Sequence, residues 1–382
     1  MAFLAQPLEL AGLHLRNRLV MLPMVTNLAQ PDSTVSEATI AHYGARAARE
    51  VGMVIVEATA VAQDARNIAR GLGAWDDDHV PGLARLANRI KAGGAAAALQ
   101  LFHSGARSVA GLPAVSPSGV SLRPGAPPRV LAEEELPAIV AQFAAAARRA
   151  VVAGFDAIEV HAAHMYLLSE FLSPFSNHRQ DHYGGDVARR ARLVEEVVRV
   201  VRREAGPSFP VLLRMHGEER VQGGMTHQDV LDTAERLAEA GVDAFDVSAI
   251  NTAQLVEKGG YSYWSTKPYL TKDDPPGAAL GNAAAIRQAT GVPVIAVGKM
   301  GLPEVAERAL ATCQADLVGV ARGFLCDPGL ALKLLEGRGE DIIRCDECFV
   351  CLDLVVTQHK SIRCSQNRSL GRLAATAEAA KS

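Results

Sequence analysis

A short stretch after the fourth apolar run of the chain carries two imidazoles and a phenol at close spacing. His161 and His164 are three residues apart, and Tyr166 follows two residues later. If this segment forms a single turn, both imidazoles face one side and can donate to one substrate oxygen. A phenol with an ordinary pKa of about 10 can give its proton to a carbon that gains negative charge. Two alternatives stay open on these residues alone: core histidines beside a packing tyrosine, or a zinc pair whose third ligand is not apparent.

A group of cysteines near the C-terminus is the second chemical signal. Cys345, Cys348, Cys351 and Cys364 lie within twenty residues, the first three at Cys-x-x-Cys steps. Three thiolates on one tight loop and a fourth from a separate turn favour a 4Fe-4S cluster. A structural zinc site, which more often takes two separated Cys-x-x-Cys pairs, and unligated thiols are the alternatives. Two cysteines stand apart and are interpreted as simple buried thiols: Cys313 and Cys326.

Length and composition limit the class of protein. The chain has 382 residues, about half of them apolar, and a formal charge of −3. This length suits one barrel with an extension, and the charge argues against nucleic-acid binding. We find no apolar run of about eighteen residues, no membrane segment and no signal-peptide pattern at the start. Together with clustered cysteines, which in a reducing compartment favour metal ligation over disulfides, these features predict a soluble cytoplasmic protein.

Short β-rich runs alternate with helix-like stretches along the chain. The strand candidates are 18–24, 53–57, 96–102, 156–160, 210–214, 244–248, 293–297 and 316–320. The helical candidates are 36–50, 80–93, 134–153, 186–205, 226–240, 280–289, 302–311 and 327–337. Eight alternations of this kind predict an α/β fold, a closed (β/α)8 TIM barrel rather than an open doubly wound sheet. The expected domains are a barrel over 1–340 and a cysteine-rich extension over 341–382.

Polar or glycine-rich residues follow most strand candidates, at the barrel end where chemistry takes place. Two inserts, 103–133 and 249–279, are too long for ordinary connections, so we expect both to lie over the barrel mouth. No Gly-x-Gly-x-x-Gly motif follows a strand candidate, which argues against a Rossmann domain.

Several segments together resemble the old yellow enzyme family of FMN-dependent barrels. Residues 161–166 read His-Ala-Ala-His-Met-Tyr, 100–107 read Gln-Leu-Phe-His-Ser-Gly-Ala-Arg, and 316–322 read Asp-Leu-Val-Gly-Val-Ala-Arg. The likeness covers roughly residues 5–340. The cysteine spacing is similar to that of the iron–sulfur branch, which includes trimethylamine dehydrogenase and 2,4-dienoyl-CoA reductase. Those relatives carry further flavin and dinucleotide domains, which we expect to be missing because the chain stops about thirty residues past Cys351.

The resemblance implies a set of contacts with FMN. The expected contacts are Pro23, Met24, Val25, Thr26, Ala58, Gln100, Arg214, Gly298, Lys299, Ala321 and Arg322. Among them, Arg214 would stabilise the negative charge of reduced flavin, and the last four residues would bind the phosphate. Gln30 stands where trimethylamine dehydrogenase has the cysteine that links its flavin covalently. We therefore expect FMN without a covalent bond.

The leading hypothesis from this resemblance is an ene reductase acting on a small-molecule enone or enoyl substrate. Hydride would come from FMN, His161 and His164 would hold the carbonyl oxygen, and Tyr166 would protonate the adjacent carbon. Electrons would come from NAD(P)H, or through the cluster from an external electron carrier or partner reductase. We also expect a homo-oligomer.

Two other functions remain open at this point. An amine dehydrogenase or oxidative N-demethylase would pass electrons out through the cluster. The aromatic bowl that such enzymes use for a methylated cation survives only as Trp264, an expected substrate contact, so amine oxidation is disfavoured. A non-enzymatic electron-transfer subunit would depend on a partner protein for the missing domains.

Overall fold

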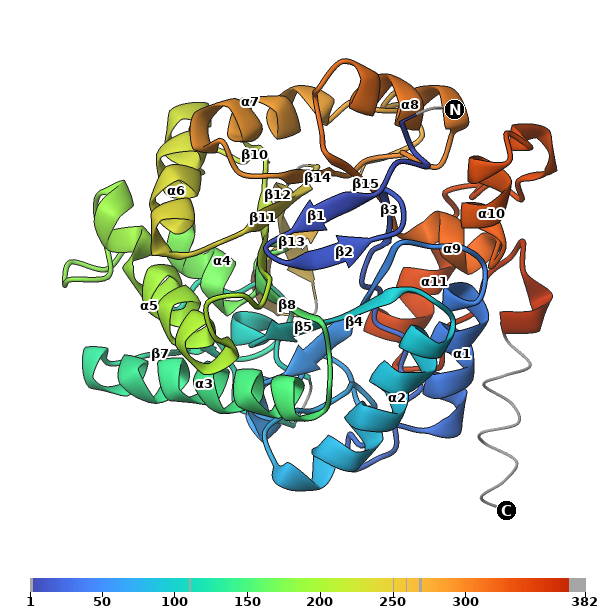
Figure 1. Cartoon of the computed structure of the whole chain (residues 1–382). Coiled ribbons are helices and arrows are strands. Elements are labelled where there is room, and N and C mark those ends of the chain that lie inside the picture. Colours follow the sequence, from blue (N-terminus) through green and yellow to red (C-terminus); the bar gives the residue numbers. More distant parts are fainter. Residues whose placement is uncertain (1–2, 110, 250, 259, 268–269, 371–382) are drawn as a thin grey trace.

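Eight parallel strands form a closed barrel in the computed structural model (Figure 1). The structure describes residues 3–109, 111–249, 251–258, 260–267 and 270–370. The barrel strands are β3 (Leu19–Met21), β4 (Met53–Ala60), β5 (Ala96–Phe102), β8 (Ala157–Ala162), β9 (Val211–His216), β11 (Ala244–Ser248), β14 (Val294–Ala296) and β15 (Leu317–Val320). Each overlaps one expected strand, and β15 pairs with β3 to close the ring. The predicted TIM barrel is confirmed.

Helices form a ring outside the barrel, as the alternating pattern predicts. They are α1 (Glu37–Ala47), α2 (Val80–Ala92), α3 (Leu136–Val152), α5 (Val187–Ala205), α6 (His227–Ala240), α7 (Leu280–Thr290), α8 (Pro303–Ala311) and α10 (Leu330–Leu335). Polar caps fix where helices begin: Asp186 accepts from the backbone N–H of Arg189, and Thr226 and Asp229 form a capping box. Two short helices that the periodicity did not predict follow strand ends: α4 (Leu167–Leu172) and α9 (Arg322–Cys326).

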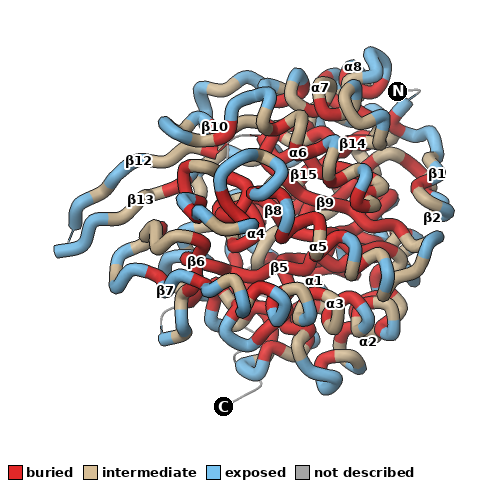
Figure 2. The backbone as a smooth tube through the Cα atoms, turned by 90° about the vertical axis from the view of Figure 1, so that its left-hand side faces the viewer, coloured by how far each residue is buried: buried red, intermediate tan, exposed pale blue. Residues whose placement is uncertain are grey.

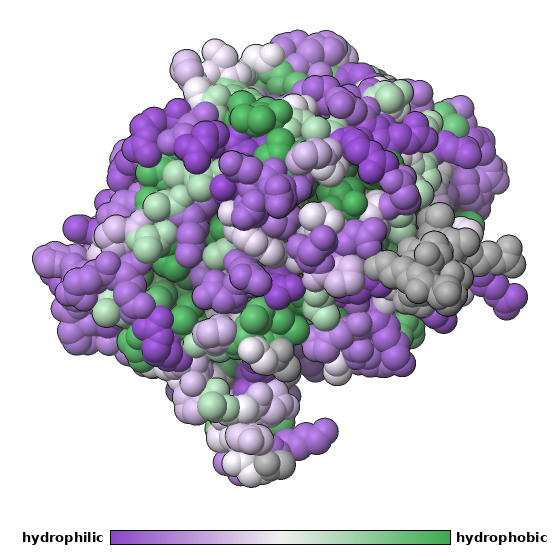
Figure 3. All heavy atoms as spheres, turned by 90° about the horizontal axis from the view of Figure 1, so that it is seen from below, coloured by the Kyte–Doolittle hydropathy of each residue, from purple (hydrophilic) through white to green (hydrophobic). Residues whose placement is uncertain are grey.

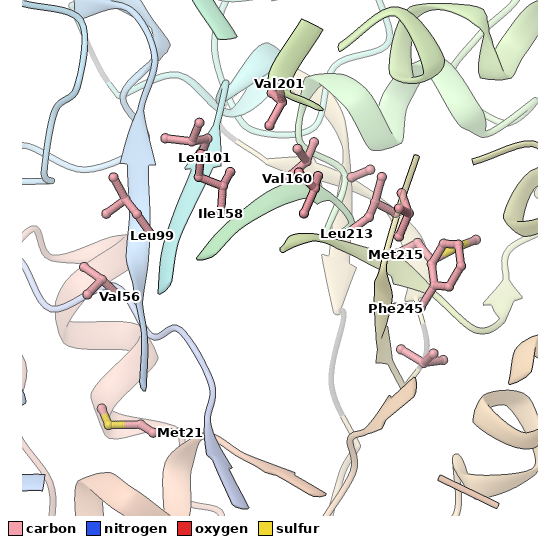
Figure 4. Packing of buried hydrophobic residues seen from close by; sticks show 14 of the residues in the cluster. Met21, Val56, Leu99, Leu101, Ile158, Val160, Val201, Leu213, Met215 and Phe245 are labelled. Atoms are coloured by element: carbon pink, nitrogen blue, oxygen red, sulfur yellow. The ribbon is translucent and has the colours of Figure 1, made fainter. Parts of the chain in front are cut away.

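The main core lies between the strands and the surrounding helices. Val160 and Leu213 of the barrel and Val201 of α5 are fully buried within it (Figure 4). Buried residues run through the centre of the molecule in Figure 2. A second cluster at the N-terminal ends of the strands includes Leu10 and Leu15 from the hairpin of β1 (Leu8–Leu10) and β2 (Leu13–Leu15). This hairpin closes one end of the barrel and leaves the other end for the site.

Both long inserts contribute β structure and meet at the barrel mouth. The first holds β6 (Val115–Ser116) and β7 (Arg129–Val130); the second holds β12 (Asn251–Lys258) and β13 (Tyr261–Lys267), with β12 also pairing with β10 (Glu219–Arg220). Figure 2 shows the β12–β13 hairpin projecting from the body. Midway along it, the backbone N–H of Trp264 donates to the carbonyl of Ser121 in the first insert at 2.8 Å. The inserts therefore support each other.

The segment after the barrel packs against the outside of α1 and the β3 end. It contains α11 (Val350–Leu352) and a π-helical turn, Asp353–Thr357. Val355 and Ile362 are fully buried in a cluster with Leu28 and Ile68. The backbone N–H of Ile362 donates to the carbonyl of Thr26 at 2.9 Å. The last part of the expected extension, residues 371–382, lies outside the described residues.

The surface of the molecule is mostly hydrophilic on the face that Figure 3 shows. Figure 3 shows one face on which hydrophilic residues predominate and apolar residues form small separate groups. Among the described residues, none of the helices is both long and apolar enough to span a bilayer.

Candidate active site

A cavity of about 680 Å³ opens at the C-terminal ends of the barrel strands. It gathers most of the predicted site residues, which come from the ends of different strands. The predicted residues that line it are Pro23, Met24, Val25, Ala58, Gln100, His161, His164, Tyr166, Arg214, Gly298, Lys299, Ala321, Arg322 and Cys345. Residues so far apart in the sequence meet here because every parallel strand ends at the same rim.

Two residues predicted to contact flavin or substrate do not line this cavity. The Thr26 side chain is fully buried behind the end of β3, where its hydroxyl donates to Glu57 Oε1 at 2.5 Å. The Trp264 ring packs edge-on against Phe175, with ring centroids 5.0 Å apart. The neighbouring Ser265 and Thr266 line the cavity instead. The register of the β12–β13 hairpin decides which of these side chains faces the cavity, and the sequence pattern does not reveal that register.

The floor of the cavity holds a buried network of charged and amide groups. The side-chain amide of Gln100 donates from Nε2 to Glu159 Oε1 at 2.7 Å. Arg214 lies beside Asp246, with 3.4 Å between Nε and Oδ2. Burial raises the pKa of the Glu159 carboxyl well above its usual range, and the nearby Asp246 charge adds to this effect. Glu159 is therefore the neutral member of the carboxyl pair, and Arg214 balances Asp246.

The turn after β8 brings the predicted imidazoles together. The ring centroids of His161 and His164 are 4.9 Å apart, at an interplanar angle of 88°. His164 has a positive φ of 62°, a strained conformation that its backbone N–H stabilises by donating to His216 Nε2 at 2.9 Å. His164 Nε2 also contacts Ser248 Oγ at 2.8 Å. Ser248 is one of the polar strand-end residues expected at the barrel mouth, whereas the sequence analysis assigned no role to His216, although it also ends a barrel strand.

Both cavity imidazoles are neutral at ordinary pH. Burial, reinforced by the positive charge of Arg214, lowers the pKa of His161 and of His164 well below the usual range. The backbone N–H of Ala163 donates to His161 Nδ1 at 3.3 Å. Nε2 of His161 therefore carries the proton and can donate a hydrogen bond.

Tyr166 lies on the cavity wall between aromatic and cationic neighbours. Its ring makes edge contacts with Phe102 and His161, at centroid distances of 5.2 and 5.1 Å. The Arg107 guanidinium lies 5.8 Å from the ring centroid and donates to the carbonyl of His164. The side-chain amide of Asn67 donates to the phenol oxygen at 2.6 Å. Neither Arg107 nor Asn67 was assigned a role from the sequence.

The opposite end of the cavity is cationic. Arg322 Nη1 is buried and has no hydrogen-bond partner among the residues that the structure describes. Gly298 has a φ of 111°, and a Cβ there would come within 2.9 Å of Leu270 Cδ1, so only glycine lets the backbone pass. The Lys299 ammonium pairs with Glu347 at 3.0 Å. This end of the cavity fits an anionic group.

The cysteine loop forms part of the same wall. Cys345 and Phe349 line the cavity, and the Arg322 guanidinium lies 4.7 Å from the Phe349 ring centroid. Cys364 Sγ is 3.5 Å from Cys326 Sγ, and Cys326 also hydrogen-bonds Cys345. The interpretation of Cys326 as a thiol apart from the others is therefore wrong, because α9 carries it into the group. Cys313 is exposed rather than buried.

The other two thiols of the group differ in exposure. Cys351 is buried, whereas Cys348 is exposed and contacts Ser365 Oγ at 3.3 Å. Within the described parts of the chain, no three metal-ligating side chains are arranged to hold a metal ion.

Comparison with known proteins identifies the family. Residues 3–341 match the NADH:flavin oxidoreductase / NADH oxidase family. The chain belongs to this family. A metal reductase of Desulforamulus reducens is 36% identical over 378 residues, which are 97% of this chain and 54% of the relative. An NADPH dehydrogenase of Geobacillus thermodenitrificans is 38% identical over 330 residues, which are 85% of this chain and 91% of the relative.

The fold comparison agrees with the family assignment. The structure of a 2-naphthoyl-CoA reductase in complex with 2-naphthoyl-CoA superposes with a TM-score of 0.89 at 26% identity, covering 97% of this chain and 58% of that chain. This chain thus spans little more than half the length of that structure and of the metal reductase. The resemblance to the old yellow enzyme family is confirmed, and the chain belongs to a family of NADH:flavin oxidoreductases.

Proposed function

We propose that this protein is an FMN-dependent ene reductase, which reduces an activated carbon–carbon double bond next to a carbonyl group. One observation carries the proposal: two neutral imidazoles and a phenol converge on one cavity that also ends in a cationic recess. Neutral imidazoles can donate hydrogen bonds to a substrate carbonyl oxygen. A phenol can give a proton to the carbon beside that carbonyl. Reduction of an activated double bond needs both functions on one substrate.

The cavity residues fit FMN. The unpaired Nη1 of Arg322 and the backbone at Gly298 and Lys299 would hold the phosphate, because a phosphate accepts several charge-assisted hydrogen bonds. Pro23, Met24, Val25, Ala58, Gln100 and Arg214 would hold the ring. Since Nε2 of Gln100 is committed to Glu159, its amide oxygen remains as an acceptor for a ring N–H. When bound, FMN supplies the hydride for the double bond.

The protein's own residues act on the substrate's oxygen and carbon. His161 donates from Nε2 to the carbonyl oxygen, and His164 provides the second contact from the same side. These hydrogen bonds stabilise the negative charge that the oxygen gains. Tyr166 then gives its phenolic proton to the neighbouring carbon, and water restores that proton.

The tail cysteines would hold a 4Fe-4S cluster. Cys345, Cys348, Cys351 and Cys364 would supply the thiolates that this cluster needs. Cys345 and Cys364 lie against Cys326, Cys351 is close to both, and Cys345 lines the cavity. Cys348, whose Sγ lies 3.3 Å from Ser365 Oγ, would supply the fourth thiolate. Cys345 lines the same cavity as Arg322 and Val25, and a cluster held by these thiolates would supply one-electron transfer beside the proposed flavin site. NAD(P)H or an external carrier would supply the electrons, and we place the protein in the reducing cytoplasm.

The amine dehydrogenase alternative finds less support. An aromatic bowl for a methylated cation needs several ring faces toward the substrate. Trp264 packs on Phe175 outside the cavity lining, so we do not propose it as a substrate contact.

The test is the oxidation of the reduced holoenzyme by 2-cyclohexenone under anaerobic conditions. NADPH reduces the bound flavin, and stopped-flow absorbance then follows its reoxidation. We expect Tyr166→Phe to slow reoxidation by about 10²-fold or more, since it removes the proton donor. Reduction by NADPH should stay unchanged in the same variant. An unaltered reoxidation rate in Tyr166→Phe would rule out the role of this phenol.

A further inference from the structure

We propose that Asn67 is a positioning residue that aims the Tyr166 proton into the cavity. This inference rests on the proposed function of Tyr166 as the proton donor. The hydrogen bond from Asn67 Nδ2 to the phenol oxygen is 2.6 Å long, and Asn67 itself is buried. A side-chain amide nitrogen only donates, so the phenol must accept in this contact. Its own O–H is then free to point elsewhere.

The surroundings of Tyr166 leave the cavity as the direction for that proton. The ring edges of Phe102 and His161 and the Arg107 guanidinium surround the phenol ring, and no other hydrogen-bond partner of its oxygen is found among the described residues. Arg107 donates its N–H groups and cannot accept a proton. The cavity, which Tyr166 lines, is where an acceptor carbon would lie.

Asn67 is held from both sides by its own loop, which follows β4. The carbonyl of the preceding Arg66 accepts from the backbone N–H of Val109 at 2.8 Å and lies 3.5 Å from the Ser108 hydroxyl. The following Ile68 is fully buried in the apolar cluster with Val355 of the tail. A buried amide on such an anchored segment cannot turn freely, so Nδ2 of Asn67 stays directed at the phenol oxygen of Tyr166.

The same hydrogen bond changes the chemistry of the phenol. When the O–H bond of Tyr166 breaks and the substrate carbon takes the proton, the electron pair stays on the phenolate oxygen. Burial raises the pKa of Tyr166, whereas the Arg107 charge and the Asn67 hydrogen bond lower it. Asn67 thus stabilises the phenolate as it forms and also sets the direction of the transfer.

Asn67→Asp is the decisive variant because it keeps the shape and reverses the hydrogen bond. An ionised carboxylate accepts only, so it would take the phenol O–H and turn the proton away from the cavity. At about pH 8 we expect reoxidation of the reduced holoenzyme by 2-cyclohexenone to be at least about tenfold slower than in the wild type. As the pH falls through the pKa of the introduced carboxyl, which burial should raise above the ordinary value of about 3.9, the group takes up a proton and can donate again, so the ratio to wild type should recover.

Three comparisons make the outcome decisive. Gln63→Glu introduces the same charge at an exposed position of the same loop and should behave as the wild type at every pH. Reduction by NADPH and flavin content should be unchanged in Asn67→Asp. Wild-type rates in Asn67→Asp at every pH, or a loss that does not vary with pH, would overturn the inference. Tyr166→Phe, measured in parallel, distinguishes failure of the Asn67 inference from failure of the proposed function. An unchanged reoxidation rate in Tyr166→Phe would rule out Tyr166 as the proton donor.

Discussion

Gln100 of β5 and Glu159 of β8 are joined across the cavity floor by a 2.7 Å hydrogen bond from Nε2 to Oε1. The two residues occupy paired positions of neighbouring strands. Because this bond fixes which way the Gln100 amide is turned, its oxygen stays available as an acceptor on the cavity side. A flavin ring bound there would meet a preset acceptor rather than a freely turning amide.

This relationship predicts how Glu159→Gln affects flavin binding. An amide at position 159 can present its oxygen or its nitrogen to Gln100, so the preset orientation is lost. We expect FMN to bind the flavin-free protein about tenfold more weakly, equivalent to about 1.4 kcal/mol. Quenching of FMN fluorescence during titration measures the affinity. Glu196→Gln, which changes the outer contact with Tyr183, is the control; equal affinities in both variants would contradict the role of Glu159.

Glu57 predicts a pH-dependent stability. It accepts from the backbone N–H of Thr26 at 2.7 Å and from the Thr26 hydroxyl, but its complete burial raises its pKa to about 7. Because the folded pKa lies above the unfolded value of 4.5, folding favours the protonated form. This contribution is fully present below about pH 4.5 and is lost as the pH rises through about 7.

The matching measurement compares Glu57→Gln with the wild type. Gln does not titrate, so the wild type should lose up to about 3 kcal/mol of stability relative to the variant between about pH 4.5 and 7. Urea unfolding at several pH values gives this difference. A difference between the two proteins that does not change with pH would show that Glu57 does not titrate in this range.

We expect His161 to act as a neutral hydrogen-bond donor, without a positive charge. Since burial lowers its pKa well below the usual range, the imidazole should not titrate between about pH 6 and 8. His161→Asn keeps an N–H donor and should keep most of the alkene-dependent rate, whereas His161→Leu should lose about 10²-fold. Steady-state rates across this pH range measure both effects. The opposite result would be a wild-type rate that falls as the pH rises through about 6.5, with no such fall in His161→Asn. That result would show that the imidazole acts in its protonated form.

We expect replacement of different cysteines to change the iron content of the protein by different amounts. The proposed cluster takes Cys348 from the two-step loop, whereas Cys326 is fixed within α9. Anaerobically purified wild-type protein should contain about four iron atoms per chain. Cys348→Ala should lose most of this iron, and Cys326→Ala should retain it; the exposed Cys313→Ala is the control. Iron retained in Cys348→Ala but lost in Cys326→Ala would assign the fourth ligand to α9.

The barrel could be predicted because its pattern is local. Each expected strand overlaps an observed one, since buried parallel strands read as short apolar runs and amphipathic helices read as a period near 3.6. The residues at strand ends, from Met24 to Arg322, could be placed at one rim by the same logic, because parallel strands of a closed barrel all end on one side.

The partners of those residues could not be predicted. Asn67 lies in a loop 99 positions before Tyr166, and nothing in its neighbours marks it as a contact of that phenol. Trp264 was expected at the cavity, but the pairing of Leu255 with Trp264 in the hairpin and the packing on Phe175 direct its ring elsewhere. Cys326 read as an isolated thiol until α9 brought it to Cys364.

The sequence by itself therefore determined the family, the barrel, the rim residues and the cysteine group, because composition, periodicity and motif spacing are properties of neighbouring residues. Tertiary structure alone decided which side chains touch: Asn67 with Tyr166, Glu159 with Gln100, and Glu57 with Thr26. Such contacts join distant segments through side-chain direction and strand register, and these are fixed only when the whole barrel is packed.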